Sequence, residues 1–220
     1  MAALAIAALW ITFGATHMLL SSQALRPRLV GALGDRAFLG VYSLVALAVF
    51  VPLVSVYFAN QHAGPHLFYL GGLPGVRWIA YGMMGAAFAL VVAGVARPSP
   101  ASLSPGRPEP AGALRITRHP VFMATGLFGL AHLLSASVNA SELAFFAGFP
   151  FFALLGSWHQ DMRKLASGDE AFRYFHDATP FLPFSRPGAV PLALREDAIP
   201  IVIGIGVTFV VRYFHAALFS

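Results

Sequence analysis

Long apolar runs separated by polar segments dominate the chain. Six of them approach the roughly 20 residues that an α-helix needs to cross a bilayer: residues 3–22, 38–59, 77–96, 119–137, 141–158 and 199–219. They lack the strict alternation of apolar and polar positions that marks membrane β-strands. The pattern predicts an all-α, polytopic membrane helical bundle of about six transmembrane helices, forming one domain over residues 1–220.

Positive charge is distributed unevenly among the connections. The first, third and fifth connections hold 12 of the 14 Lys and Arg residues, whereas the second and fourth have only Arg77 at a span edge. By the positive-inside rule, the basic loops are cytoplasmic and both termini lie outside. The net charge of +5 then reflects topology rather than nucleic-acid binding. We expect an integral protein of the bacterial inner membrane, with lipid as its partner.

Two polar segments lie on the expected cytoplasmic side. The linker 97–114 contains a Pro/Ser/Gly-rich stretch, 97–110, for which we expect little fixed structure. The segment 159–198 is longer and polar. In it, Ser167 and Glu170 have the spacing of a capping box that starts a short helix through EAFRYFH. We expect the aromatic residues of this helix to lie at the membrane surface.

The composition narrows the candidate chemistry. Cysteine is absent, which excludes disulfides, thiolate ligands and iron–sulfur clusters. Few ionisable side chains fall deep in the predicted spans: His17 and His132, with Arg212 and His215 near an end. Intramembrane ionisable residues are candidate functional residues by default. Arg212 and His215 are typical of an interface anchor, which leaves His17 and His132 as the candidates.

The two deep histidines share a local pattern. Each follows a phenylalanine by four residues and a glycine by three: Phe13, Gly14 and His17; Phe128, Gly129 and His132. Because helical side chains lean toward the N-terminus, each glycine leaves room where the imidazole points. One interpretation is close helix packing. The other is a shared haem b with His17 and His132 as axial iron ligands, although they lie toward opposite halves of the bilayer.

A basic motif opens the fourth span. His119 precedes Pro120, which suits the first turn of a helix, and clusters with Arg115 and Arg118. His119 and His132 are about 20 Å apart along the helix and about 140° apart around it, so they cannot bind one metal. Two interpretations stay open: a topology-setting helix end, and an anion site for a headgroup, a haem propionate or a nucleotide-like cofactor.

Three stretches carry a family resemblance: GATHMLLSSQALRPRLVGALGDRAFLGVYSLVAL, ALRITRHPVFMATGLFGLAHLL, and GSWHQDMRK with the later TPFLPF. In these, the chain resembles the NnrU membrane proteins and, more distantly, the plastid ζ-carotene isomerases. The resemblance implies a link to denitrification, and b-type haem, because the isomerases use ferrous haem to isomerise a polyene. It also matches His17 and His132 to histidines implicated in haem function, and His119 to the RHP histidine. The isomerases have a cysteine near the position of Gly129, so a thiolate step does not carry over.

Three functions follow from these observations. The first is a haem b-binding protein of the NnrU type that acts on an apolar small molecule, as an isomerase or oxidoreductase. The second is a membrane S-adenosylmethionine-dependent methyltransferase, in which a basic helix start and a later acidic pair hold the cofactor. Gln160 and Asp161 stand where that pair is expected. The third is a non-catalytic assembly factor.

Overall fold

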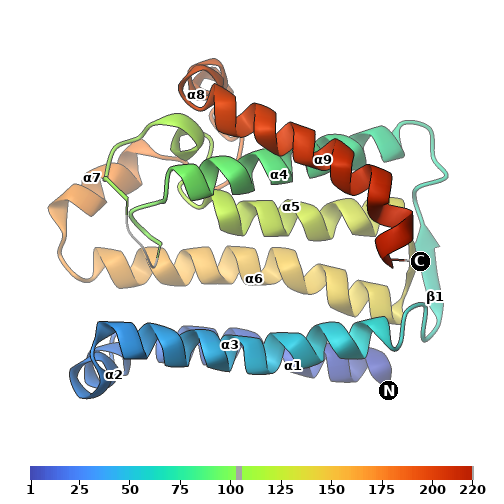
Figure 1. Cartoon of the computed structure of the whole chain (residues 1–220), viewed down its shortest axis with the longest axis horizontal. Helices are drawn as coiled ribbons and strands as arrows, with labels where there is room; N and C mark the ends of the chain where they lie inside the picture. Colours follow the sequence, from blue (N-terminus) through green and yellow to red (C-terminus); the bar gives the residue numbers. More distant parts are fainter. Residues whose placement is uncertain (103–105, 220) are drawn as a thin grey trace.

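Helices account for most of the computed structural model, which describes residues 1–102 and 106–219 (Figure 1). The six long helices are α1 (Ala2–Leu20), α3 (Asp35–Phe58), α4 (Val76–Ala96), α5 (Pro120–Ser135), α6 (Ala140–Leu165) and α9 (Ala198–Phe219). They match the six predicted spans, which confirms the predicted helical bundle, but α6 continues seven residues beyond the predicted end at 158, into the segment predicted to be polar and separate. Within the described residues, five are long and apolar enough to cross a membrane, and α5 is shorter, with 16 residues.

Shorter elements lie at the two ends of the bundle. One end carries the arginine-rich loops and is called the basic end: α2 (Arg26–Leu33), η1 (Gly112–Arg115), α7 (Glu170–Ala178), η2 (Pro187–Ala189) and α8 (Val190–Glu196). At the other, the sheet end, β1 (His66–Tyr69) pairs antiparallel with β2 (Ser137–Asn139), and His66 lies opposite Asn139. Both chain termini lie at the sheet end (Figure 1), which agrees with an even number of passes.

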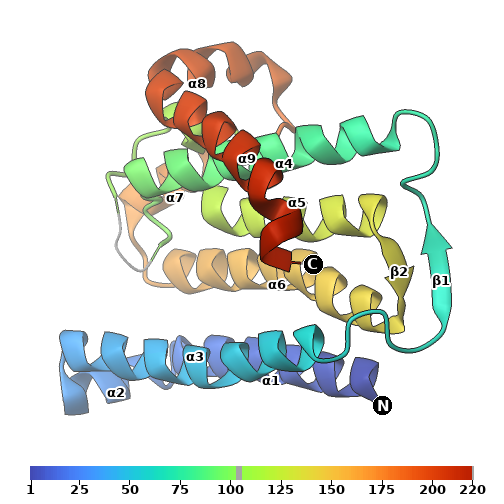
Figure 2. The same cartoon turned by 45° about the vertical axis from the view of Figure 1, so that its right-hand side comes forward.

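The long helices pack in layers. α1 and α3 form one layer, α6 packs on α1, α5 on α6, α4 on α5, and α9 on α4 (Figures 1 and 2). An aromatic core joins α1, α3 and α6 around Trp10, whose indole Nε1 donates a hydrogen bond to the carbonyl oxygen of Phe145 at 3.0 Å. A second core of smaller aliphatic side chains, including Leu90 and Ile201, joins α4, α5 and α9.

The start of α7 differs from the sequence prediction. Its N-cap is Asp169, whose side chain accepts a hydrogen bond from the Phe172 backbone N–H at 3.1 Å. Ser167 instead donates to the carbonyl of Lys164 at the end of α6. The predicted helix is therefore confirmed, with a different capping residue.

Two of the three aromatic residues of α7 lie inside the protein and not at the predicted membrane surface. Phe172 and Phe175 are buried against Ala101 and Leu114 in a small core at the basic end, whereas Tyr174 is exposed. The linker 97–114 contributes to this core, so the described part of it has fixed structure. Residues 103–105 of the linker lie outside the described residues.

α6 approaches α1 closely at Gly148, where a Cβ would overlap the indole of Trp10. We expect Gly148→Ala to lower the free energy of unfolding by about 1–3 kcal/mol, the usual cost of overpacking. The matched control is Gly40→Ala on α3, because nothing lies within 4 Å of its Cβ position. Thermal unfolding in detergent, followed by circular dichroism, measures both variants. Equal melting temperatures would contradict the close contact.

Candidate functional site

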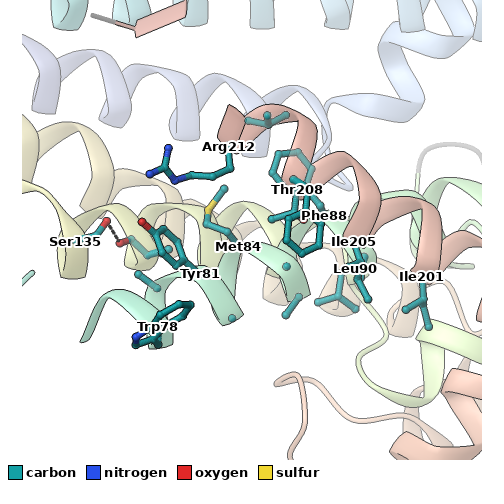
Figure 3. Close-up of a pocket in the computed structure, with 18 of the residues that line it drawn as sticks. Trp78, Tyr81, Met84, Phe88, Leu90, Ser135, Ile201, Ile205, Thr208 and Arg212 are labelled. Atoms are coloured by element: carbon teal, nitrogen blue, oxygen red, sulfur yellow. Dashed lines mark hydrogen bonds between the residues drawn. The ribbon is translucent and has the colours of Figure 1, made fainter. Parts of the chain in front are cut away.

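A large apolar cleft lies between α4, α5 and α9. Its volume is about 1060 Å³, at the upper end of the range of roughly 300–1,000 Å³ that small-molecule sites occupy. Figure 3 shows Phe88 of α4 lining it together with Ile205 and Thr208 of α9. Ile201 and Arg212 also line it, so the cleft follows α9 for about 16 Å. The cleft is long enough to hold an extended hydrocarbon chain.

Polar side chains gather at the sheet end of this cleft. The Arg212 guanidinium carbon lies 5.7 Å from the centre of the Tyr81 ring, and Figure 3 shows both near Ser135. The imidazoles of His132 and His215 also line this end, with ring centroids 6.3 Å apart. The sequence had marked Arg212 and His215 only as an interface anchor. The sequence feature that could have identified this end of the cleft is the presence of an arginine and a second histidine in the last span.

The rim of the cleft faces outward from the bundle. Trp78 and Phe209 line it and are 77% and 72% exposed. Because both lie on helices long enough to span a bilayer, the exposed rim faces lipid when these helices are embedded. An apolar ligand would therefore enter the cleft from the bilayer.

One ring nitrogen of His132 is engaged within its own helix. Its Nδ1 lies 2.8 Å from the carbonyl oxygen of Phe128, and since a carbonyl only accepts, Nδ1 must carry the proton. Histidines that bind metals commonly donate their other ring N–H in this way. The ring stacks on Phe146 with centroids 4.6 Å apart. Nε2 is thus the nitrogen available to a ligand.

His17 lies in a different part of the bundle. Its ring packs against Tyr42 and Phe152, with centroids 4.7 and 5.3 Å away. His132 packs on Phe146 instead, and Phe146 and Phe152 are about 9 Å apart along α6. The structure does not bring His17 and His132 to one site, so an iron bound by both would require the helices to rearrange.

The two glycines of the shared pattern have different surroundings. Nothing lies within 4 Å of the Cβ position at Gly14, whereas a Cβ at Gly129 would overlap the Phe146 carbonyl on α6. Gly129 therefore allows α5 and α6 to pack closely, which was the alternative interpretation of the pattern. The Phe128 ring lies beside His132, with centroids 4.3 Å apart.

A second polar cluster is enclosed at the basic end. The Asp161 carboxylate on α6 accepts hydrogen bonds from Arg118 Nε at 2.7 Å and from His119 Nε2 at 2.9 Å. All three side chains are at most 9% exposed. Arg118 also donates to the Thr179 carbonyl at 2.8 Å and lies 3.1 Å from His176 Nε2.

This cluster corrects the interpretation of Arg118 and His119 as a site that faces an external anion. Their anion is the protein's own Asp161 carboxylate, which compensates the buried positive charge internally. The sequence analysis had noted Asp161 only because Gln160 and Asp161 stand where an acidic pair is expected. Two sequence features could have indicated this pairing. An acidic residue follows the end of one predicted span, and a basic motif starts the neighbouring span.

Arg115 has an internal partner as well. Its guanidinium donates to Glu196 at 2.8 and 3.0 Å, which holds the pKa of that carboxyl below its usual range. Arg97 donates twice to the adjacent Asp197, which also accepts from the Ala113 backbone N–H at 2.7 Å. These contacts fix η1 and the start of α9 at the basic end of the cleft. All three basic side chains of the motif are therefore paired within the chain, which weighs against the methyltransferase interpretation.

The side chains available as metal ligands limit the kind of metal centre that the chain can form. Within residues 1–102 and 106–219, no group of three or more His, Cys, Asp or Glu side chains is placed to hold a metal ion. A haem iron, in contrast, takes only axial ligands from the protein. His132 fits that role, with His215 as the other imidazole at the same end of the cleft.

Comparison with known proteins gives a consistent result. The family model described as NnrU protein matches residues 5–220. The 15-cis-zeta-carotene isomerase, chloroplastic, of Zea mays is 26% identical over 186 residues, which is 80% of this chain and 48% of that protein. Its counterpart in Arabidopsis thaliana is 27% identical over 174 residues, covering 75% and 46%. The chain thus spans about half the length of these curated relatives. No solved structure matches.

Removing the Asp161 charge leaves Arg118 buried without its counter-ion. We expect Asp161→Asn to cost about 3–5 kcal/mol of unfolding free energy, as breaking a buried pair does. The control is Asp177→Asn, because Asp177 is 73% exposed and contacts only His176 among these residues. Chemical denaturation in detergent measures the difference. If Asp161→Asn cost no more than the control, the cluster would not hold the basic end together.

Proposed function

The chain belongs to the NnrU family, and we propose that it is an integral membrane protein that binds haem b and isomerises a long polyene. The observation that carries the proposal is the cleft between α4, α5 and α9, with His132 at its polar end. The names of the curated relatives supply the substrate class. The distribution of arginine and lysine supports an orientation with the basic end in the cytoplasm, and the proposed location is the bacterial inner membrane.

The residues at the sheet end of the cleft fit haem b. Nε2 of His132 would hold the haem iron, because Nδ1 is engaged by the Phe128 carbonyl. Arg212 is a cation at the same end, suited to a propionate. Haem iron, when bound, supplies a metal centre able to interact with the π-electrons of a polyene. His17 lies away from this cleft and has no role in the proposed site.

The protein's own contribution to the reaction is to bind the substrate, to orient it and to enclose it. Apolar side chains along α4 and α9, such as Phe88 and Ile205, align an extended chain and exclude water. His132 and His215 lie together at one end, so a ligand that fills the cleft presents a fixed part of its length to them. Positioning of this kind favours reaction at one double bond of several.

Haem binding is tested by loading the detergent-purified protein with haem and recording its absorbance, oxidised and reduced. We expect a Soret band that shifts on reduction, is lost in His132→Ala and is kept in His17→Ala. Circular dichroism checks that both variants fold. Loss in His17→Ala with retention in His132→Ala would contradict the assignment, as would a wild type that binds no haem.

The role of the cleft in substrate binding is tested by a substitution that fills part of it. Gly85 lines the cleft and has nothing within 4 Å of its Cβ position, so the Cβ of Gly85→Leu meets no neighbour and the larger side chain adds bulk to the lining of the cleft. We expect conversion of 15-cis-ζ-carotene, followed by chromatography in producing cells, to fall about fivefold to 150-fold, since overfilling a site costs about 1–3 kcal/mol. Gly40→Leu on α3 is the control. Equal conversion by both variants would place the substrate elsewhere.

A further inference from the structure

A separate group of basic side chains lies at the basic end (Figure 1), on α2 and on the last turn of α6. Arg26 begins α2, and Arg163 and Lys164 lie in the last turn of α6. Arg26 and Arg163 are near enough for their charges to repel, and Lys164 is near both. We call these three residues the α2–α6 cation cluster. They belong neither to the cleft nor to the Asp161 cluster.

The α2–α6 cation cluster lacks the internal counter-ions found elsewhere. Arg97, Arg115 and Arg118 each have a carboxylate oxygen within 3 Å. In the described part of the chain, no carboxylate forms an ion pair with any of the three clustered cations, and Asp169 acts on Lys164 only at longer range. Three like charges held together without a partner destabilise the protein unless an anion joins them.

Arg163 is only partly solvated. Its Nε is enclosed and has no hydrogen-bond partner among the described residues. Arginines that anchor a helix end extend their guanidinium into water or headgroups. A buried N–H without an acceptor is unfavourable. A ligand that supplies a hydrogen-bond acceptor at this position would therefore stabilise the site.

Neutral polar groups surround the same position. Ser21 Oγ, at the end of α1, lies 3.2 Å from His159 Nε2, one turn before Arg163 on α6. The Tyr42 hydroxyl on α3 lies near Ser21, and it interacts electrostatically with both Arg26 and Arg163. The Arg26 guanidinium carbon lies 5.7 Å from the Phe38 ring centre, which fixes its place. Polar side chains from α1, α2, α3 and α6 therefore gather in one region of the basic end.

The cluster lies at the level of lipid headgroups when the helices span a bilayer. α1 ends at Leu20 and α6 at Leu165, so the cations stand where the apolar segments finish. Next to them, α6 exposes a strip of large apolar side chains: Leu155, Trp158 and Met162. Tryptophan is enriched at this depth of the membrane, and the strip offers a surface for acyl chains.

We propose that the α2–α6 cation cluster binds a phosphate group. A phosphate supplies several acceptor oxygens and the missing negative charge, and arginine binds it through two parallel hydrogen bonds. The adjacent apolar strip favours the phosphate of an anionic membrane phospholipid as the source. Inorganic phosphate offers the same group without acyl chains. The proposal does not depend on haem or on a polyene.

The test is the thermal stability of the detergent-purified, phosphate-free protein, titrated separately with phosphatidylglycerol and with inorganic phosphate. Wild type is compared with Arg26→Gln and Arg163→Gln. The matched control is Arg28→Gln, because Arg28 is an exposed arginine on the same short helix. Circular dichroism establishes the fold of each variant before titration, and Arg26→Gln provides the answer if Arg163→Gln does not fold.

We expect the order of thermal stability among the proteins to reverse when the ligand is added. Without ligand, Arg163→Gln is at least as stable as wild type, because the substitution removes an unpaired cation. With ligand, wild type and Arg28→Gln gain stability by mass action, and the two cluster variants gain less than half as much. A larger gain from phosphatidylglycerol identifies a lipid, and an equal gain from inorganic phosphate identifies the free anion. Equal gains in all four proteins, or no gain in wild type, would overturn the proposal.

Discussion

The buried carboxylate of Asp161 is the constraint on which the basic end of the structure depends. It binds Arg118 and His119 at the start of α5, and these residues in turn are tied to the segment after α7. Thr117 donates to the Phe181 carbonyl, and the Arg118 backbone N–H donates to Pro180. One carboxylate therefore joins two long helices and a loop. A charge enclosed in this way is stable only with its partners in place, so the three segments hold one another.

The rest of the architecture divides the bundle into a tightly packed half and an open half. Glycines at helix crossings, such as Gly129 and Gly148, bring α5, α6 and α1 into close contact. On the far side of α4, helix α9 touches its neighbour at Gly204 but leaves a long cleft beside it. The packed half fixes the position of α5, and α5 carries His132 to the edge of the open half. A rigid support of this kind is what a ligand-binding histidine requires.

The fold was largely readable from the sequence, and the site only partly. Apolar runs locate the six long helices because hydropathy depends on the bilayer rather than on neighbours. The proximity of His132 to His215, and the ion pair of Arg118 with Asp161, depend on which helices pack together, which one sequence does not reveal. The shared pattern around His17 and His132 suggested one site because helical spacing is local information. Helix packing separated them, and gave Gly129 a structural role.

The central claim is that the cleft between α4, α5 and α9 holds a long apolar ligand next to His132. Its most direct test is photo-crosslinking of the membrane-embedded protein with a diazirine-labelled polyene, mapped by mass spectrometry. The account predicts adducts concentrated on cleft-lining residues such as Met84, Phe88 and Thr208, and their loss when unlabelled polyene competes. Adducts concentrated on α1 and α3, or spread evenly over all lipid-facing helices and insensitive to competition, would contradict it.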